Sequence, residues 1–364
     1  MKPPKNGQAW YRLRKEANAR KRRWLKRFGR AGAAVTALWL HFEDEATSCP
    51  ACGSTRLSLL DVLRVRGDMT GRRLTFLAGC EECGLLFCNP LPQPDKLEGF
   101  YGDTGVWAQE HAERAAHLAA VHERRLRRRK KGGSDVRTRK RPRLLEALEP
   151  YIPVTSPAPG ARAIDFGCGE GKLLNWLQDF GWDTFGIEPS IDVAFLRHHR
   201  LAAPPQDGSF DVAILHHVLE HVPNPLEVLR QLAATLRQDG RLFISVPRLD
   251  TLPQHGDFHY CINGRNHLVA FTEACLQSLL ARAGFEVIGR LHGADLDQAL
   301  TDGVPLRMRL VARRTDSPLV PPAAPLDAAR HALEQYARTH SLAGRRIRLP
   351  IPLRLRGGWM QRGL

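Results

Sequence analysis

The sequence lacks an apolar run long enough to cross a membrane. Its most apolar early segment, Ala31–Phe42, has 12 residues, whereas a membrane-spanning helix needs about 20. That segment follows a basic stretch and has no clear small-residue cleavage site, which argues against a secretory signal. The sequence also has no internal repeat. These absences predict a cytoplasmic protein that is neither membrane-spanning nor secreted.

Acidic residues are scarce in two parts of the chain, and this scarcity produces the net charge of +16. Residues 1–40 contain 12 Lys and Arg against one acid, and residues 111–145 contain 13 against three. Between residues 145 and 314 the balance reverses, with 15 basic residues against 20 acidic ones. Runs of like charge are usually solvated. The basic segments therefore predict at most a weak association with nucleic acid or an anionic membrane surface.

Cysteines are also few, but four of the eight form two C-x-x-C pairs, each followed by glycine and separated by 27 residues. Without a secretory signal, a disulfide framework is disfavoured. Two such pairs supply the four thiolates of a tetrahedral zinc site, and the alternative is a pair of redox-active dithiols. We expect structural zinc on Cys49, Cys52, Cys80 and Cys83, and we expect Cys88 to serve only in packing.

Strand and helix patterns alternate after residue 143, which predicts right-handed crossovers and a mostly parallel, doubly wound Rossmann-like α/β sheet. The predicted strands are Ala161–Phe166, Thr184–Ile187, Phe210–Leu215, Arg241–Val246, Phe285–Arg290 and Leu306–Ala312. The predicted helices are Lys172–Phe180, Ile191–His199, Pro225–Leu236 and Thr272–Ala283, with one more over Asp327–His340. The expected domains are a basic segment (1–44), a zinc-ribbon-like module (45–100), a basic connector (101–142), the α/β domain (143–315) and a Pro-rich linker with a basic tail (316–364).

The most informative segment is a glycine-rich turn that follows the first strand of this series, AIDFGCGEGK. The strand ends in Asp165, and glycines at alternating positions lead into a helix. Glycines suit a tight turn whose backbone touches a ligand, and ligands of open α/β sheets bind at the carboxyl ends of strands. The cofactor-binding candidates in this turn are Asp165, Gly167, Cys168, Gly169 and Gly171.

The acids around this turn distinguish two kinds of ligand. A dinucleotide site normally has G-x-G-x-x-G and places a pyrophosphate at the helix N-terminus. Here the spacing is G-x-G-x-G, and carboxylates at Asp165 and Glu170 would repel a pyrophosphate. They suit S-adenosylmethionine (SAM), which carries a sulfonium and an ammonium group. The second strand ends at Glu188, 19 positions after Gly169, close to the spacing at which an acid reaches ribose hydroxyls.

These segments resemble class I SAM-dependent methyltransferases. The resemblance runs from about Leu144 to Ala312 and rests on DFGCGEG, GIEPS and FDVAILHHVLEHVPNPLEVLRQLAATLRQDGRLFISVP, the last being similar to the ubiquinone-biosynthesis branch. It implies that Asp165, Gly167 and Gly169 line the methionine part of SAM. It also implies that Glu188 binds the ribose. Members usually have an acid at the end of a third strand that contacts adenine, but RHHRLAAPPQDGSFD is too short for a full strand and loop.

Histidines cluster where the fourth strand is predicted to end. His216 and His217 are candidates for a general base that removes the acceptor's proton, and the alternative is that they order the loop. Glu220 and His221 are residue types that bind metals, but two adjacent ligands do not make a site. We expect them to shape the loop. The family resemblance further implies that Tyr260 and His267 belong to the acceptor pocket.

The acceptor is less constrained than the cofactor. The cysteine module followed by GLLFCNPLPQPDKLEGFYGD resembles the zinc ribbon that precedes many bacterial methyltransferase domains, and that resemblance implies a small-molecule, sugar or lipid-linked acceptor. The alternative is a nucleic-acid methyltransferase, or an RNA-binding protein with a degenerate methyltransferase fold. The basic segments and the zinc ribbon favour this alternative, whereas the acidic catalytic region and the absence of an N-P-P-Y-type motif disfavour it. The sequence does not indicate an oligomeric state.

Overall fold

The protein is described from a computed structural model, which describes residues 48–64, 74–102, 105–109, 120, 142–189, 197–291, 305–339, 355–356 and 358–359. The basic segment 1–44 and most of the connector 101–142 lie outside the described residues, so the predictions made for them stay predictions. The strands are β1 (Leu57–Arg64), β2 (Leu74–Cys80), β3 (Leu86–Asn89), β4 (Arg162–Phe166), β5 (Asp183–Ile187), β6 (His199–Arg200), β7 (Phe210–His216), β8 (Leu236–Pro247), β9 (Val269–Ala270), β10 (Phe285–Arg290), β11 (Arg307–Arg314), β12 (Leu355–Arg356) and β13 (Gly358–Trp359).

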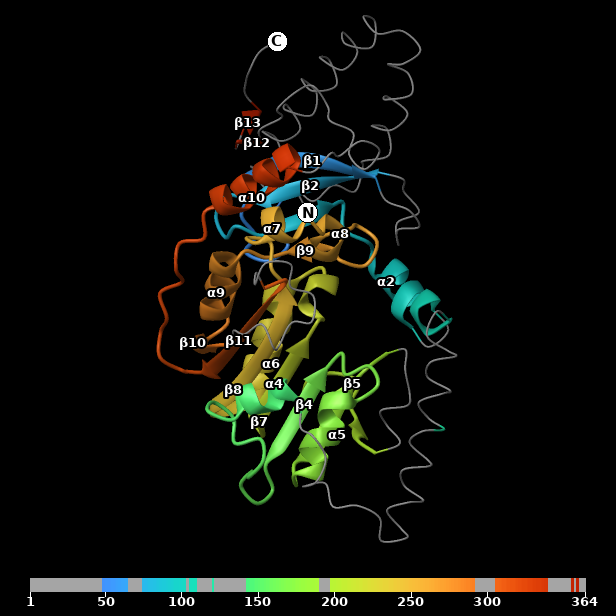
Figure 1. The fold of residues 1–364 in the computed structure, drawn as a ribbon, viewed down its shortest axis with the longest axis vertical. Coiled ribbons are helices and arrows are strands. Elements are labelled where there is room, and N and C mark those ends of the chain that lie inside the picture. Colours follow the sequence, from blue (N-terminus) through green and yellow to red (C-terminus); the bar gives the residue numbers. More distant parts are fainter. Residues whose placement is uncertain are drawn as a thin grey trace, which may run out of the picture.

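The helices connect and cover these strands (Figure 1). They are α2 (Pro94–Tyr101), α4 (Arg143–Leu148), α5 (Lys172–Asp179), the 3-10 turn η3 (Leu219–His221), α6 (Pro225–Thr235), α7 (Leu252–His255), α8 (Phe258–Cys261), α9 (Glu273–Arg282) and α10 (Leu326–Thr339). Among the described residues, no helix combines the length and apolar character needed to cross a membrane.

The central sheet has seven strands in the order β10-β11-β8-β7-β4-β5-β6. Strands β8, β7, β4, β5 and β6 are parallel, while β11 runs antiparallel to both β8 and β10. The strand order reverses beside β4, so the carboxyl ends of β4 and β7 adjoin the crevice where ligands of such sheets bind. The predicted doubly wound, mostly parallel sheet is confirmed.

Both faces of the sheet are covered, because successive side chains of a strand point to opposite faces. On β7, Ala213 and Leu215 pack in one core with leucines of α6 and α9. Val212 and Ile214 pack in a second core with leucines of α4 and α5. These strands are consequently apolar on both sides and show no alternation in the sequence, as expected for buried parallel strands.

A second sheet, of order β1-β2-β3-β9, joins the cysteine-containing segment to the α/β part of the chain. Strands β1 to β3 form an antiparallel meander, and β9, from far along the sequence, pairs with β3 at its edge. Helix α10 packs on this sheet, with Leu326 and Leu333 in one apolar cluster with Leu77 and Leu86 (Figure 1). The amide of Cys88 donates to the carbonyl of Leu268, 2.8 Å away, and Cys88 is buried as expected.

The structure corrects the sequence-based boundaries in two places. Strand β8 begins at Leu236, five residues before the predicted start, because Leu236 pairs with Phe210 of β7. The segment after His198, which the sequence assigned to no complete strand, contributes the two-residue β6 beside β5. Most of the helix predicted over Ile191–His199 lies outside the described residues, but its predicted end is wrong, because His199 belongs to β6. Helix α10 appears where Asp327–His340 was predicted.

Candidate functional site

The glycine-rich turn wraps over the carboxyl ends of β4 and β5. The amides of Gly167 and Cys168 both donate to the carbonyl of Ile187, at 2.7 and 3.1 Å. The amide of Gly169 donates to Oε2 of Glu188 at 3.0 Å. The structure therefore brings the predicted acid of the second strand against the predicted loop.

Two carboxyl groups at this edge are almost completely buried. Asp165 is 3% exposed and Glu188 is 8% exposed. Oδ1 of Asp165 has no hydrogen-bond partner among the described residues. Burial raises the pKa of Asp165 well above its usual value, and the neighbouring Glu188 raises it further. Burying a charged carboxylate is unfavourable, so a positively charged ligand beside these two carboxyl groups would be stabilised.

Glu170, the third acid of the turn, contributes less to this charge than the sequence suggests. Its Oε2 lies 2.7 Å from Nζ of Lys172 at the start of α5. That ion pair compensates its charge locally. The electrostatic argument against a pyrophosphate therefore rests on Asp165 and Glu188.

Gly167 is the glycine of the turn whose identity is most strictly required. Its φ is +75°, and a Cβ at this position would stand 2.5 Å from Cγ2 of Val218, the residue after His217. Gly160 has the same φ of +75° but nothing within 4 Å of its Cβ position. A comparison of Gly160 with Gly167 therefore separates the energetic cost of a left-handed backbone from the cost of a steric clash with Val218.

We expect Gly160→Ala to lower the free energy of unfolding by about 1 kcal/mol, which is the cost of a left-handed alanine. Gly167→Ala is expected to lower it by about 2 to 4 kcal/mol because the overlap with Val218 adds to this cost. Chemical denaturation of both variants measures the difference. Equal losses for the two would show that the loop and the end of β7 are not packed as described.

The edge beyond β5 differs from what the family pattern would require. Strand β6 ends in Arg200, whose guanidinium donates to the backbone carbonyl of Glu188 at 3.2 Å. Asp207 accepts from the amide of Ser209 at 3.1 Å and so belongs to the turn before β7, as predicted. Among the described residues of this edge, a basic side chain ends the third strand where the family has an acid.

The two histidines at the end of β7 have different surroundings. The ring of His216 stacks on Phe243 at a centroid distance of 6.0 Å, and burial lowers its pKa to about 3, with His217, Arg307 and Arg309 acting in the same direction. His216 is therefore neutral at physiological pH. His217 has a φ of +60°, a strained conformation that is enriched at functional sites. Its Nδ1 lies 3.1 Å from Oε1 of Glu220.

The residues that cover this end of the sheet come from distant parts of the chain. The hydroxyl of Tyr101, the last residue of α2, lies 3.0 Å from Nδ1 of His221. The ring centroids of His221 and His267 are 4.7 Å apart. The ring centroid of Tyr260 lies 6.2 Å from those of both His217 and His267. The predicted pocket residues Tyr260 and His267 thus adjoin the histidine cluster. Sequence reasoning missed Tyr101, since no pattern near α2 indicates which helix face meets a loop 120 residues away.

The sequence comparisons bear on this same region. Residues 112–289 match the model of a family described as a methyltransferase domain, and the match includes the glycine turn, Glu188 and the histidine cluster. Residues 112–289, a little under half of the chain, therefore resemble a methyltransferase domain. Ubiquinone biosynthesis O-methyltransferase of Xanthomonas campestris pv. campestris (strain B100) is 34% identical over 121 residues, which are 28% of this chain and 51% of that protein. The corresponding enzyme of Xanthomonas oryzae pv. oryzae (strain PXO99A) is 31% identical over 121 residues, with the same coverage. The chain thus spans about half the length of the curated relatives it matches.

Solved structures similar to the methyltransferase domain are more distant in sequence. A 1,6-didemethyltoxoflavin-N1-methyltransferase of Burkholderia thailandensis has 20% identity and a TM-score of 0.40, and the match covers 68% of this chain and 97% of that one. A SAM-dependent methyltransferase of Mesorhizobium loti has 20% identity and a TM-score of 0.37, with coverage of 46% and 96%. At this level of similarity they say nothing about the acceptor.

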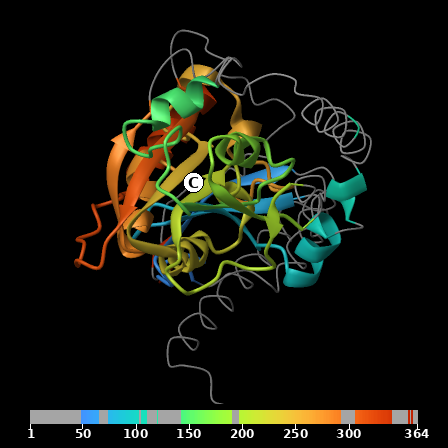
Figure 2. The ribbon, with the colours of Figure 1, turned by 90° about the horizontal axis from the view of Figure 1, so that it is seen from below.

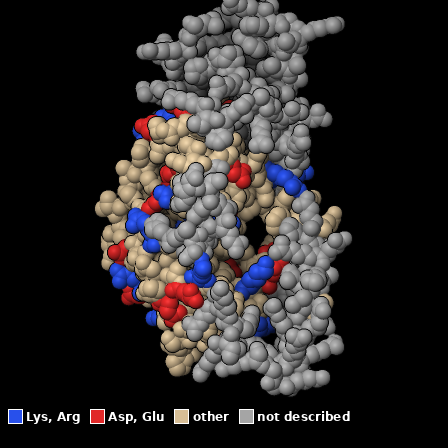
Figure 3. All heavy atoms as spheres, viewed as in Figure 1, with Lys and Arg blue, Asp and Glu red and all other residues tan. Residues whose placement is uncertain are grey.

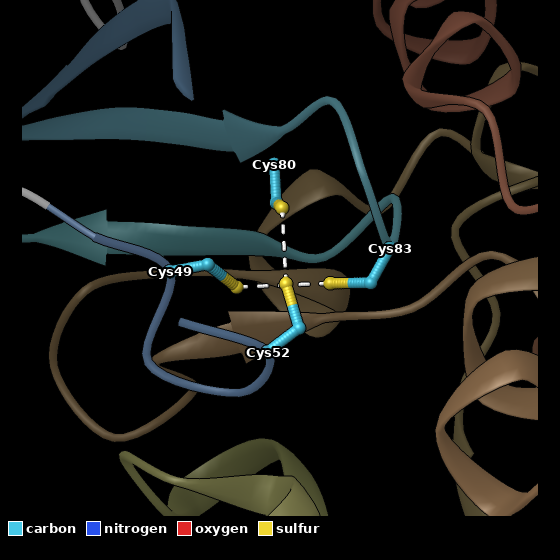
Figure 4. Close-up of side chains that lie close together, drawn as sticks. All are labelled: Cys49, Cys52, Cys80 and Cys83. Carbon is cyan, nitrogen blue, oxygen red and sulfur yellow. Dashed lines mark hydrogen bonds between the residues drawn. The ribbon is translucent and has the colours of Figure 1, made fainter. Parts of the chain in front are cut away.

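The four predicted metal-binding cysteines converge beside the methyltransferase domain (Figure 4). The sulfurs of Cys49 and Cys83 are 3.6 Å apart, as are those of Cys52 and Cys80, and all four sulfurs lie within 4.8 Å of one another. Thiolates bound to one zinc ion at about 2.3 Å are separated by about 3.8 Å. The spacing therefore fits a tetrahedral zinc ion and is too long for disulfides.

The two cysteine turns are built alike. The amide of Gly53 donates to the carbonyl of Cys49, and the amide of Gly84 donates to that of Cys80, both at 3.0 Å. Both glycines are left-handed, at φ +74° and +72°. This conformation closes each turn and directs both of its sulfurs to one point, which explains the glycine after each C-x-x-C pair.

Proposed function

We propose that this chain uses SAM to methylate a hydroxyl group of a small-molecule acceptor. The observation that carries the proposal is the pair of buried acids, Asp165 and Glu188, at the edge of the sheet beside the histidine cluster. Two buried carboxyl groups side by side, one of them with an oxygen that has no hydrogen-bond partner among the described residues, favour a cationic, phosphate-free nucleoside over a dinucleotide. The backbone of Gly167 and Gly169, with the Cys168 and Gly171 positions, would line the methionine part, and Glu188 would bind the ribose hydroxyls.

SAM supplies an electrophilic methyl group on sulfur, so the protein's contribution is to position the acceptor and take its proton. His217 is the residue we assign to proton removal. Its Nδ1–H can donate to the buried Glu220, which fixes the ring and leaves Nε2 as the basic nitrogen. The acceptor oxygen would then bond to the methyl carbon as the carbon–sulfur bond breaks. His216, with its lowered pKa, is a poorer base and serves as packing beside His217.

The acceptor is assigned to the small molecules on three grounds. The relatives with 31–34% identity are named as O-methyltransferases of ubiquinone biosynthesis. The face shown in Figure 3 carries acidic and basic side chains intermixed over its described part, rather than one basic stripe. Tyr101, Tyr260 and the histidines would present aromatic surface to an acceptor ring. The basic segments that favoured a nucleic-acid or membrane partner lie outside the described residues, and that alternative stays a prediction.

For the cysteine cluster we propose a structural zinc ion. Cys49, Cys52, Cys80 and Cys83 would fill all four positions, which leaves none for a substrate. Three of the four thiols are buried, and strands β2 and β3 of the module share an apolar cluster with α7, α8 and α10. Metal binding would therefore contribute much of the folding free energy of the module.

An assay of methyl transfer tests the proposed acceptor chemistry. With tritiated SAM and a panel of hydroxylated aromatic acceptors, labelled product is expected with the native protein. His217→Gln is expected to lower kcat by about 100-fold with little change in KM, the usual contribution of a positioned base. The matched control is His199→Gln, which removes an exposed histidine of β6 and should keep full activity. Unchanged kcat in His217→Gln would remove the base assignment, and labelling of RNA alone would move the protein to the nucleic-acid class.

A further inference from the structure

Arg200 is a basic side chain beside Glu188 that the proposed reaction does not use. It is the last residue of β6, the strand at one end of the seven-stranded sheet. Parallel pairing places Arg200 level with Gly186 of β5. The amide of the next residue, Leu201, donates to the carbonyl of Gly186 at 2.9 Å, so the pairing continues to the end of the strand. Arg200 therefore lies at the same carboxyl edge of the sheet as Glu188, one strand farther out.

The guanidinium of Arg200 extends along this edge toward the glycine turn. Its Nη2 donates to the backbone carbonyl of Glu188 at 3.2 Å, and the residue as a whole is exposed to solvent. Its charge acts on the turn itself, because burial, Asp165 and Glu188 raise the pKa of Cys168 while Arg200 opposes that rise. A guanidinium has five N–H donors and no acceptor, so Arg200 can recognise only groups that accept hydrogen bonds.

The proposed cofactor would lie along the same edge in a fixed order, and this step rests on the proposed function. Its methionine part would lie over the turn after β4, and its ribose would lie on Glu188 at the end of β5. The base is attached to the ribose at the end opposite to the methionine, so it extends toward the end of β6. Neighbouring strands lie about 4.8 Å apart, a distance that an arginine side chain spans. The base is also the uncharged part of SAM, so Arg200 would not face the sulfonium or the ammonium group.

We propose that Arg200 binds the nucleobase of the cofactor, and that the site for this reason does not select for the 6-amino group of adenine. That amino group is a donor, which a guanidinium cannot accept, and only ring nitrogens such as N7 can accept from Arg200. A 6-oxopurine offers N7 and O6 together, the two atoms that arginine binds with two N–H groups when it reads guanine in nucleic acids.

A carboxylate at the end of β6 would have the opposite preference, since it would accept from the amino group and repel O6. The first acid after β6, Asp207, already accepts from the amide of Ser209 in the turn before β7. Stacking of the planar guanidinium on the base would add affinity for any purine without distinguishing one from another. Arg200 therefore suits hypoxanthine at least as well as adenine.

Binding of two cofactor analogues to the full chain tests this inference without an activity assay. S-adenosylhomocysteine and S-inosylhomocysteine differ only in the 6-position of the base and the proton on N1. Isothermal titration of the native protein is expected to give dissociation constants within about 3-fold of each other. Arg200→Glu is expected to bind the adenine compound about 10- to 100-fold more tightly than the hypoxanthine compound, the usual discrimination of a paired base contact.

Two further variants complete the comparison. Arg200→Lys keeps a cationic donor but loses the planar fork, so it should weaken both analogues without creating a preference. Arg237→Glu is the matched control, because Arg237 is an exposed arginine near the start of β8, where it pairs with Asp211. It should keep both native affinities.

The ratio of the two affinities separates recognition of the base from a structural role of Arg200. Loss of the bond to the carbonyl of Glu188 by itself would weaken both analogues equally. A native preference for the adenine compound above about 10-fold overturns the inference and leaves the proposed function intact. The same ratio in the native protein and in Arg200→Glu overturns it as well. A native protein that binds neither analogue would instead remove the cofactor assignment, and the inference with it.

Discussion

Cys52→Ser and Cys80→Ser are each expected to lose the zinc of the cysteine site and to unfold the sheet β1-β2-β3-β9. Structural zinc contributes a binding free energy on the order of 10 kcal/mol, and three thiolates cannot complete the tetrahedron. Elemental analysis should show the loss of one metal equivalent, and thermal denaturation should show a separate transition at lower temperature. Cys261→Ser is the matched control, since Cys261 is also buried but lies outside the four-cysteine cluster and donates to the carbonyl of Arg248.

The consequence for activity follows from one backbone link. The amide of Cys88 donates to the carbonyl of Leu268 at 2.8 Å. The amide of Leu268 donates in turn to the carbonyl of Glu220, also at 2.8 Å. Unfolding β3 would therefore release Leu268 and the adjacent His267 from the acceptor side. The glycine turn and Glu188 make their described contacts within the central sheet. We expect the variants to bind SAM in isothermal titration while methyl transfer falls about 100-fold or more.

Full activity of a Cys52→Ser protein that contains no zinc at the cysteine site would contradict this account. Methyl transfer would then not depend on the fold of the cysteine module. Arg330 offers a milder test of the same coupling, since its guanidinium joins α10 to Ser58 of β1, 2.8 Å away, and to Glu81.

Asp165→Ala and Glu188→Ala are each expected to weaken SAM binding by about 100-fold or more, which corresponds to about 3 kcal/mol. Each removes a carboxylate from the edge that would hold the cation and the ribose. Isothermal titration of the purified variants provides the measurement. Asp183→Asn is the matched control because Asp183 lies at the opposite, amino end of β5, where its carboxylate pairs with Arg162 and His199.

The ligand-free stability of these variants gives an independent check. The carboxyl group of Asp165 is buried, and its raised pKa reflects an unfavourable charge in the folded protein. Removing that charge should leave the free energy of unfolding unchanged or increase it, as is common for residues kept for function. A variant with normal stability and normal SAM binding would show that the cofactor lies elsewhere.

The sequence predicted the contact between the glycine turn and Glu188 better than the contacts around the histidine cluster, for a physical reason. Asp165, the glycines and Glu188 stand at the ends of consecutive strands, and parallel pairing of β4 with β5 brings those ends together. The C-x-x-C spacing likewise carries its own geometry, since each turn closes locally through Gly53 or Gly84. Contacts of short sequence separation can be predicted from spacing alone.

The surroundings of the histidine cluster are assembled from contacts that no local pattern encodes. Tyr101 reaches His221 across 120 residues of chain, and Arg330 reaches Glu81 across 249. The sequence marked Glu220 and His221 as an incomplete pair of ligands, and only the fold brings His267 beside them. Which face of α2 meets η3, and which strand extends the sheet beyond β3, depend on packing.

The sequence by itself determined the alternating α/β pattern, the acid–glycine turn and the paired cysteines, because each rests on periodicity or spacing over a few residues. The tertiary structure decided that β9 continues the cysteine sheet, that α10 covers it, and that Tyr101 and His267 join Glu220. Those arrangements depend on which apolar faces bury one another, and burial is a property of the whole chain. The residues that would hold the cofactor are therefore close to one another in the sequence. The residues that would meet the acceptor are brought together from distant parts of the chain.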